Sequence, residues 1–264
     1  MILGLDHVVV ATFELEAAVA SYAALLGCDA GAPIVDDGVA TIVLPGGNVA
    51  VELKAPVGGG EGADRLRAAL GDGEGLKSLV FAVSDIETAH RRAGRVGLDP
   101  GPIADRGDLQ SFRLADAKTS GLRLFLVERA AGAVAQQRKP GAVAGLDHVV
   151  IQSGDLERAA ALFGARLGLD MRLDREVMGR RLLFFRCGDS VVEVAQTPVA
   201  EARDRLWGLS WRVENIDAAR QRLESAGFDV SDARAGAKPG TRVVSIRNRT
   251  GNVPTILIER VSRV

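Results

Sequence analysis

Short apolar runs of β type and longer helical stripes alternate along this chain. Residues 4–10 form a short, apolar, β-branched run that predicts a buried strand. Residues 14–26 carry their apolar side chains on one stripe and are followed by Gly27, which predicts a helix and its end. Runs at 39–45 and 48–55, separated by two glycines, predict a hairpin. The predicted order is one strand, one helix, then two or three strands.

This order recurs three more times. The second unit is predicted to have a strand at 76–83, a helix that begins after an N-cap at Asp85, and a hairpin of strands 109–116 and 122–129. The third unit has a helix at 155–167 and strands near 181–187 and 190–196. The fourth spans 207–260 with a helix at 215–226. Four units of the same kind therefore fill the chain.

A repeated phrase shows that the units form two tandem pairs. Residues 4–12 read GLDHVVVAT and residues 145–153 read GLDHVVIQS, so His7 and His148 occupy the same place in the two copies. A repeat on this scale defines the architecture before any secondary structure is assigned. We expect one domain at 1–129, a linker at 130–144 that contains Pro140 and Gly141, and a second domain at 145–264.

The repeat also places acidic residues in register. Glu52 and Glu193 each stand 45 residues after the corresponding histidine, inside an apolar run. Glu128 and Glu259 form a second pair near the ends of later apolar runs. Carboxylates that face a shared interior repel one another, so they require a cation, a proton or an arginine.

Composition excludes several classes of partner. The formal net charge is −1 at pH 7 and charges of both signs are interspersed, so the chain has no basic face for nucleic acid. No apolar stretch approaches the roughly 20 residues of a membrane span. Cys28 and Cys187 suggest neither a metal knuckle nor a disulfide framework, and the N-terminal segment does not resemble a signal peptide. We therefore expect a cytoplasmic protein with a small-molecule substrate or ligand, as a monomer or homodimer.

Four strand–helix–strands units that open with LDHV and close on glutamate-bearing strands resemble the vicinal oxygen chelate superfamily, which includes glyoxalases, epimerases, extradiol dioxygenases and bleomycin-resistance proteins. The resemblance implies an α+β fold of four βαβββ units in two tandem glyoxalase-like domains, with mixed sheets curled into open cups. It specifies the fold better than the activity, since one fold hosts many chemistries.

The resemblance also implies where a divalent metal would bind. Its ligand positions lie on the first and last strands of the units. Carried onto this chain, six of them are potential ligands: His7, Glu52, Glu128, His148, Glu193 and Glu259. The two remaining positions, Ser78 and Gly208, depart from the pattern. One imidazole and two carboxylates per cup suit Mn, Co, Mg, Fe or Zn.

A metal-free cup is the competing interpretation. Arg113, Arg186 and Arg247 lie in neighbouring strands and are candidates to neutralise the glutamates and line a substrate. Under this interpretation His7 and His148 are hydrogen-bonded core residues, and the protein has no cofactor. Trp211, beside Gly208, either packs in the core or forms a wall for ligand stacking.

Three functions follow. The first is a metal-assisted lyase or isomerase that acts on a substrate with vicinal oxygens, with Glu52 or Glu193 as the catalytic base. The alternative is a binding protein of the bleomycin-resistance type, which needs no metal. The third, an extradiol-type dioxygenase, normally uses two histidines and one carboxylate, and neither half aligns two histidines.

Overall fold

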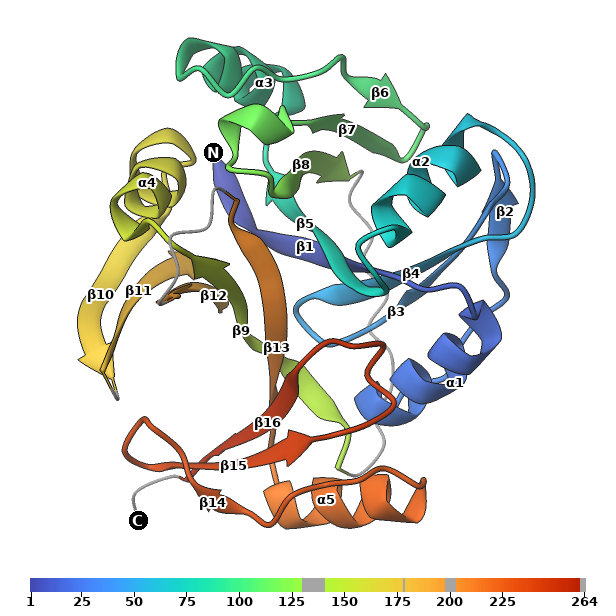
Figure 1. Ribbon diagram of the computed structural model, residues 1–264, viewed down its shortest axis with the longest axis vertical. Coiled ribbons are helices and arrows are strands. Elements are labelled where there is room, and N and C mark those ends of the chain that lie inside the picture. The colour runs from blue at the N-terminus through green and yellow to red at the C-terminus, as the bar shows by residue number, and fades with distance from the viewer. Residues whose placement is uncertain (130–140, 178, 198–202, 262–264) are drawn as a thin grey trace. The chain divides into compact units, whose positions relative to one another are not determined.

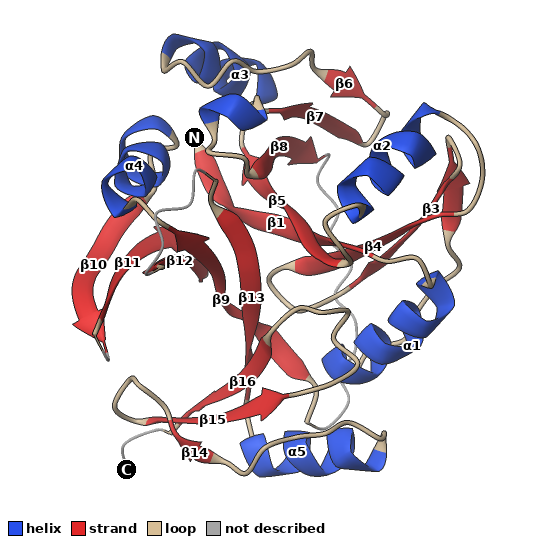
Figure 2. Ribbon diagram, viewed as in Figure 1, coloured by secondary structure: helices blue, strands red, loops and turns tan. Residues whose placement is uncertain are grey.

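The structure is a computed structural model, and it describes residues 1–129, 141–177, 179–197 and 203–261. It contains the four predicted βαβββ modules, and Figure 2 shows the helices and strands of each. The predicted linker overlaps residues 130–140, which lie outside the described residues. The strand that follows it starts at Val143, two residues earlier than the predicted second domain.

Modules 1 and 2 form the first half of the chain. The elements of module 1 are β1 (Ile2–Ala11), α1 (Leu15–Leu26), β2 (Ile34–Asp36), β3 (Val39–Leu44) and β4 (Ala50–Pro56), and α2 (Glu61–Leu70) follows them. The elements of module 2 are β5 (Gly75–Val83), α3 (Ile86–Arg95), β6 (Ala104–Asp105), β7 (Leu109–Arg113), the 3-10 turn η1 (Asp116–Lys118) and β8 (Arg123–Arg129).

Modules 3 and 4 form the second half. Module 3 consists of β9 (Val143–Ser153), α4 (Leu156–Ala160), η2 (Ala161–Arg166), β10 (Asp170–Val177), β11 (Arg180–Cys187) and β12 (Ser190–Gln196). Module 4 consists of β13 (Arg205–Val213), α5 (Ile216–Ser225), β14 (Arg234–Ala235), β15 (Thr241–Ile246) and β16 (Thr255–Arg260). The predicted helix 155–167 is therefore α4 followed by η2, a π-helical segment.

Side-chain caps define where three of the helices begin. Asp85, Asp155 and Asn215 each accept a hydrogen bond from the backbone N–H three residues later, at 2.8–2.9 Å. Such a cap satisfies one of the N–H groups that have no partner within the helix. The N-cap predicted at Asp85 is thus confirmed.

The strands form two eight-stranded mixed sheets, one from each half. The first has the order β2-β3-β4-β1-β5-β8-β7-β6 and the second β10-β11-β12-β9-β13-β16-β15-β14. β12 pairs with β9, and β13 with β16, in parallel, whereas the hairpins are antiparallel. The predicted α+β architecture of four βαβββ units in two tandem halves with mixed sheets is confirmed.

Residue contacts divide the chain into two compact units that cut across the halves. Unit 1 comprises residues 1–7, 78–134 and 148–207, so it holds most of modules 2 and 3. Unit 2 comprises 8–77, 135–147 and 208–264, which is most of modules 1 and 4. Hydrogen-bonded sheets thus group the modules by half, while compact packing groups them across halves. Figure 1 gives the course of the chain through these elements.

Alternation along the strands separates a core face from an open face. In β4, Val51, Leu53 and Ala55 are fully buried, and in β12 the same is true of Val192 and Val194. The residues between them point to the opposite face of the sheet. No helix within the described residues is long and apolar enough to cross a membrane.

Candidate functional site

His148 and Glu193 form a polar pair on the open face of module 3. His148 Nε2 lies 3.5 Å from Glu193 Oε2, and the two side chains are 17% and 16% exposed. Both residues belong to unit 1. The separation is at the long end for a hydrogen bond, and such contacts in ligand-free sites often tighten when a substrate binds. The predicted histidine and glutamate of the second half are thus brought together.

Strand register identifies the neighbours of this pair. Val191 is the partner of both His148 on β9 and Arg186 on β11, so these three side chains lie in one row on one face. Glu193 lies in the next row, where its partner on β11 is Phe184. The open face of module 3 therefore combines an imidazole, a carboxylate, a guanidinium and an aromatic ring. Arg186, predicted to line a substrate, shares this face with the pair.

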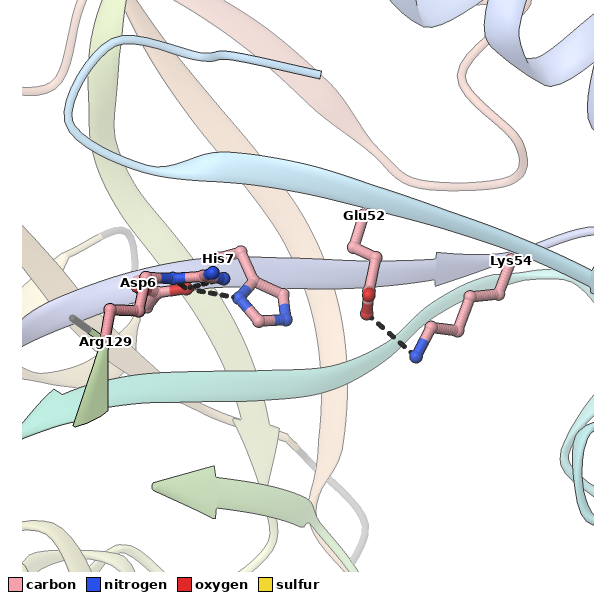
Figure 3. Close-up of polar contacts among 5 residues, drawn as sticks. All are labelled: Asp6, His7, Glu52, Lys54 and Arg129. Atoms are coloured by element: carbon pink, nitrogen blue, oxygen red, sulfur yellow. Dashed lines mark hydrogen bonds and ion pairs between the residues drawn. The ribbon is translucent and has the colours of Figure 1, made fainter. Parts of the chain in front are cut away.

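The corresponding glutamate of the first half has a different neighbour. Glu52 Oε2 lies 3.0 Å from Lys54 Nζ, an ion pair within unit 2 (Figure 3). The residue of the second copy that corresponds to Lys54 is Ala195, which has no charge. The adjacent ammonium compensates the negative charge of the Glu52 carboxylate. The two halves therefore present chemically different glutamates.

His7 is held by Asp6, which is itself bound by Arg129, and all three residues belong to unit 1 (Figure 3). Its Nδ1 lies 2.5 Å from Asp6 Oδ1, and Arg129 binds both carboxylate oxygens of Asp6 through Nε and Nη2, each at 2.8 Å. Burial acts to raise the pKa of Asp6, but hydrogen bonds from His7 and Arg129 outweigh it and lower this pKa to about 2. Because the carboxylate only accepts, Nδ1 of His7 carries the proton.

The second half repeats the arginine–aspartate pair. Arg260 Nη2 donates to Asp147 Oδ1 at 2.8 Å, as Arg129 does to Asp6. These pairs were not predicted. The sequence carries a signal for them, because each last-strand glutamate is followed by arginine and each first-strand histidine is preceded by aspartate.

Glu128 and Glu259 point to the helix side of their sheets. Each follows a buried leucine by two residues, Leu126 and Leu257 respectively, and therefore shares its face. Glu128 Oε2 accepts the backbone N–H of Ile86, the first residue of α3, at 2.8 Å.

Glu259 is engaged in an ion-pair network near α5. Arg242 Nη1 donates to Glu259 Oε2 at 3.2 Å, and Arg242 binds both oxygens of Asp217, in the first turn of α5, at 2.8 Å. Glu128 therefore contacts a helix start directly, whereas Glu259 is linked to the first turn of α5 through Arg242.

The remaining predicted lining residues are placed differently. Trp211 is fully buried on the face of Leu209 and Val213, which favours core packing over a wall for ligand stacking. Arg247 is exposed and pairs with Asp229 at 3.1 Å. Arg113 pairs with Asp116 at 2.5 Å, and its guanidinium lies 5.8 Å from the centre of the Phe125 ring.

The donors of the candidate site are too few for a divalent metal. A catalytic zinc site, for example, has three protein ligands and an open position. His148 and Glu193 supply two donors, and across the described residues no group of three or more His, Cys, Asp or Glu side chains is arranged to hold a metal ion. The residues present therefore do not complete a metal site, and metal binding stays a prediction.

Two family models match the chain. A model described as a glyoxalase-like domain matches residues 5–139, and a model of the glyoxalase/bleomycin resistance protein/dioxygenase superfamily matches residues 147–244. No curated protein sequence matches.

Solved structures share the fold at low identity. A mutant of 4-hydroxymandelate synthase from Streptomyces coelicolor aligns over 100% of this chain and 95% of its own, with a TM-score of 0.73 and 16% identity. A Mn(II)-bound glyoxalase from Novosphingobium aromaticivorans aligns over 100% and 84%, with a TM-score of 0.70 and 17% identity. A halotolerant catechol dioxygenase aligns over 98% and 87%, with a TM-score of 0.69 and 14% identity. At such identities the similarity extends to the fold alone.

Proposed function

We propose a function from the premise that this chain belongs to the glyoxalase-like domain family. The protein acts as a lyase or isomerase that moves a proton on a small substrate with neighbouring oxygens. The observation that carries the proposal is the His148–Glu193 pair on the open face of module 3. The superfamily of the second half supports this class of substrate without defining the reaction.

Glu193 acts as the base. Its carboxylate removes a proton from the carbon next to a substrate carbonyl, and the electron pair of that C–H bond moves into the carbonyl to give an enediolate. The proton then returns to the neighbouring carbon, or to the same carbon from another direction. His148 positions the carboxylate through its Nε2 contact.

Arg186 stabilises the charge that develops on the substrate oxygens. It lies two strands from His148 in the same row, roughly 10 Å apart at strand spacing, so a substrate placed over Val191 is within reach of both side chains. A guanidinium binds a pair of oxygens through two parallel N–H groups. Phe184, beside Glu193, supplies an apolar surface.

We place the reaction in the second half because residue 195 is alanine, whereas the corresponding residue of the first half is Lys54. Lys54 neutralises Glu52 in the first half, whereas Ala195 at the corresponding position leaves Glu193 beside His148 without an ammonium from that residue. Glu52 also has Val43, which is 51% exposed, as its partner on β3. That exposed apolar neighbour favours ligand binding without chemistry in the first half, which is the bleomycin-resistance alternative.

Deuterium exchange tests the proposal directly. Wild-type protein is incubated in D2O with a panel of 2-oxoaldehyde–thiol adducts, 2-hydroxy ketones and 2-methyl thioesters, and exchange at carbon is followed by NMR. We expect exchange on one class of compound, at least about 100-fold slower in Glu193→Gln because a positioned base contributes about 10²–10⁴. Glu52→Gln is the matched control and retains the wild-type rate. Equal exchange by Glu193→Gln and wild type would contradict the proposal.

Metal dependence is resolved in the same assay. Purified protein is analysed for metal per chain, treated with chelator and tested again, with His148→Ala alongside. The proposed acid–base reaction survives chelation, because no step passes through a metal. Loss of activity on chelation and recovery with Mn(II), together with metal loss in His148→Ala, would instead establish the predicted metal-assisted reaction.

A further inference from the structure

Unit 1 contains a cavity of about 250 Å³ that is lined by residues of β5, α3, β8 and the end of η2. Its volume is just below the roughly 300–1,000 Å³ typical of ligand pockets. It shares no residue with the His148–Glu193 face. Its apolar floor is made of side chains that are less than a tenth exposed, including Val83, Ala89, Ala93, Leu98, Leu114 and Leu126.

Two arginines line the cavity together with this floor. Arg92 comes from α3 of module 2, and Arg166 is the last residue of η2 in module 3. Among the residues that the structure describes, neither guanidinium has a hydrogen bond or an ion pair. The lining residues within the described part of the chain include no Asp or Glu. Two guanidinium groups without an acidic partner among the described residues, beside an apolar floor, favour an anion with a hydrocarbon body.

Gly168, which also lines the cavity, lies close to the Arg92 side chain. A Cβ built on Gly168 would lie 3.3 Å from Nη2 of Arg92, so the Arg92 side chain reaches from α3 to the segment that follows η2. Gly168 has φ +77°, a conformation that glycine adopts without strain. Arg166 stands two residues earlier. The π-helical geometry of η2 is rare and occurs frequently at functional sites.

We propose that this cavity binds a small aliphatic carboxylate, whose chain occupies the apolar floor and whose carboxylate is held between Arg92 and Arg166. The site is independent of the proposed reaction. A carboxylate fits the planar guanidinium fork, and the absence of lining acids removes competition for it.

Calorimetric titration of the full-length protein with octanoate tests the site. We expect octanoate to bind, and 1-octanol and octylamine to bind at least about tenfold more weakly, because charged hydrogen bonds stabilise the carboxylate alone. The double substitution Arg92→Gln with Arg166→Gln weakens octanoate binding by at least about tenfold. Circular dichroism verifies that each variant is folded.

Two control variants test whether the effect is specific to the arginines that line the cavity. Arg95→Gln changes an exposed arginine of the same helix that does not line the cavity, and it retains wild-type affinity. Arg186→Gln removes the arginine of the candidate site, and this variant also binds octanoate with wild-type affinity. The proposal is overturned if octanoate does not bind, if octanol binds equally well, if the double variant keeps full affinity, or if binding is lost in Arg186→Gln instead.

Discussion

At the scale of single residues, ionic partners determine what each glutamate and histidine of the repeat does. Glu52 has a lysine two residues away, and Glu193 has an alanine at the corresponding position. His7 is fixed by an ionised aspartate, whereas His148 approaches a glutamate. Because these partners differ, residues that the duplication aligned have diverged in chemistry.

Asp6 gives a pH-dependent contribution to stability. Its pKa is about 2 in the folded protein, against 3.8 for an unperturbed aspartate, so the folded state favours the ionised form. A depressed pKa stabilises the fold above the unfolded pKa, and this stabilisation is lost as pH falls through the folded pKa. The difference corresponds to about 2 kcal/mol, lost between roughly pH 4 and pH 2.

We therefore expect Asp6→Asn to be about 2 kcal/mol less stable than wild type at pH 5, and this gap to shrink to well under about 1 kcal/mol at pH 2. Urea unfolding of both proteins at several pH values measures it. A gap that stays constant from pH 5 to pH 2 would show that Asp6 is not ionised preferentially in the folded state.

At the scale of elements, the last strand of module 2 contacts the start of helix α3 through Glu128. Glu128 accepts the N–H of Ile86, and Asp85 caps the same helix through Thr88. Both carboxylates lie near the positive end of the α3 dipole. α3 is therefore capped from its own chain segment and from the neighbouring strand β8.

Glu128→Ala is expected to destabilise the protein by about 1 kcal/mol, because a helix N–H loses its acceptor. For a chain of this size the melting temperature falls by about 2–4 °C. Glu128→Gln keeps an acceptor oxygen and serves as the control, and its melting temperature falls by less. The metal content of Glu128→Ala also tests the prediction that Glu128 is a metal ligand. If Glu128 only caps α3, the variant has the same metal content as the wild type.

At the scale of the whole molecule, hydrogen bonds between residues far apart in the sequence stabilise unit 2. Arg222 of α5 donates to the carbonyl oxygens of Ala24 and Leu25 at the end of α1, and also to that of Gly141. The hydroxyl of Tyr22, fully buried, donates to the carbonyl of Thr250 at 2.8 Å. These contacts join module 1 to module 4, which the order of the chain separates by two modules.

Arg222→Gln is expected to cost about 3 kcal/mol, because half-buried carbonyls lose a charged donor. Hydrogen exchange measured by mass spectrometry locates the effect. The last turn of α1 and α5 in unit 2 lose protection, while α3 in unit 1 does not. Arg220→Gln, which removes a more exposed ion pair with Glu224, is the control and costs less than about 1 kcal/mol. Equal destabilisation by both variants would contradict the role of Arg222.

The four βαβββ modules, their two tandem copies and the equivalent positions of His148 and Glu193 to His7 and Glu52 were already evident in the amino-acid sequence. Period-2 and helical apolar patterns are local, and a duplication aligns equivalent residues whatever their contacts. The N-cap Asp85 was also local, because a cap lies within three residues of the N–H groups that it satisfies.

The face that each glutamate occupies, and the charge that lies beside it, depended on tertiary packing. Glu52 and Glu193 stand between buried apolar residues, so alternation already directs them to the open face, but the LFLVER run around Glu128 is apolar on both sides and contains no such signal. Arg129 meets Asp6 across 123 residues, and Trp211 is buried because neighbouring elements cover its face. Such contacts depend on strand register and packing between segments far apart in the chain, which local patterns do not specify.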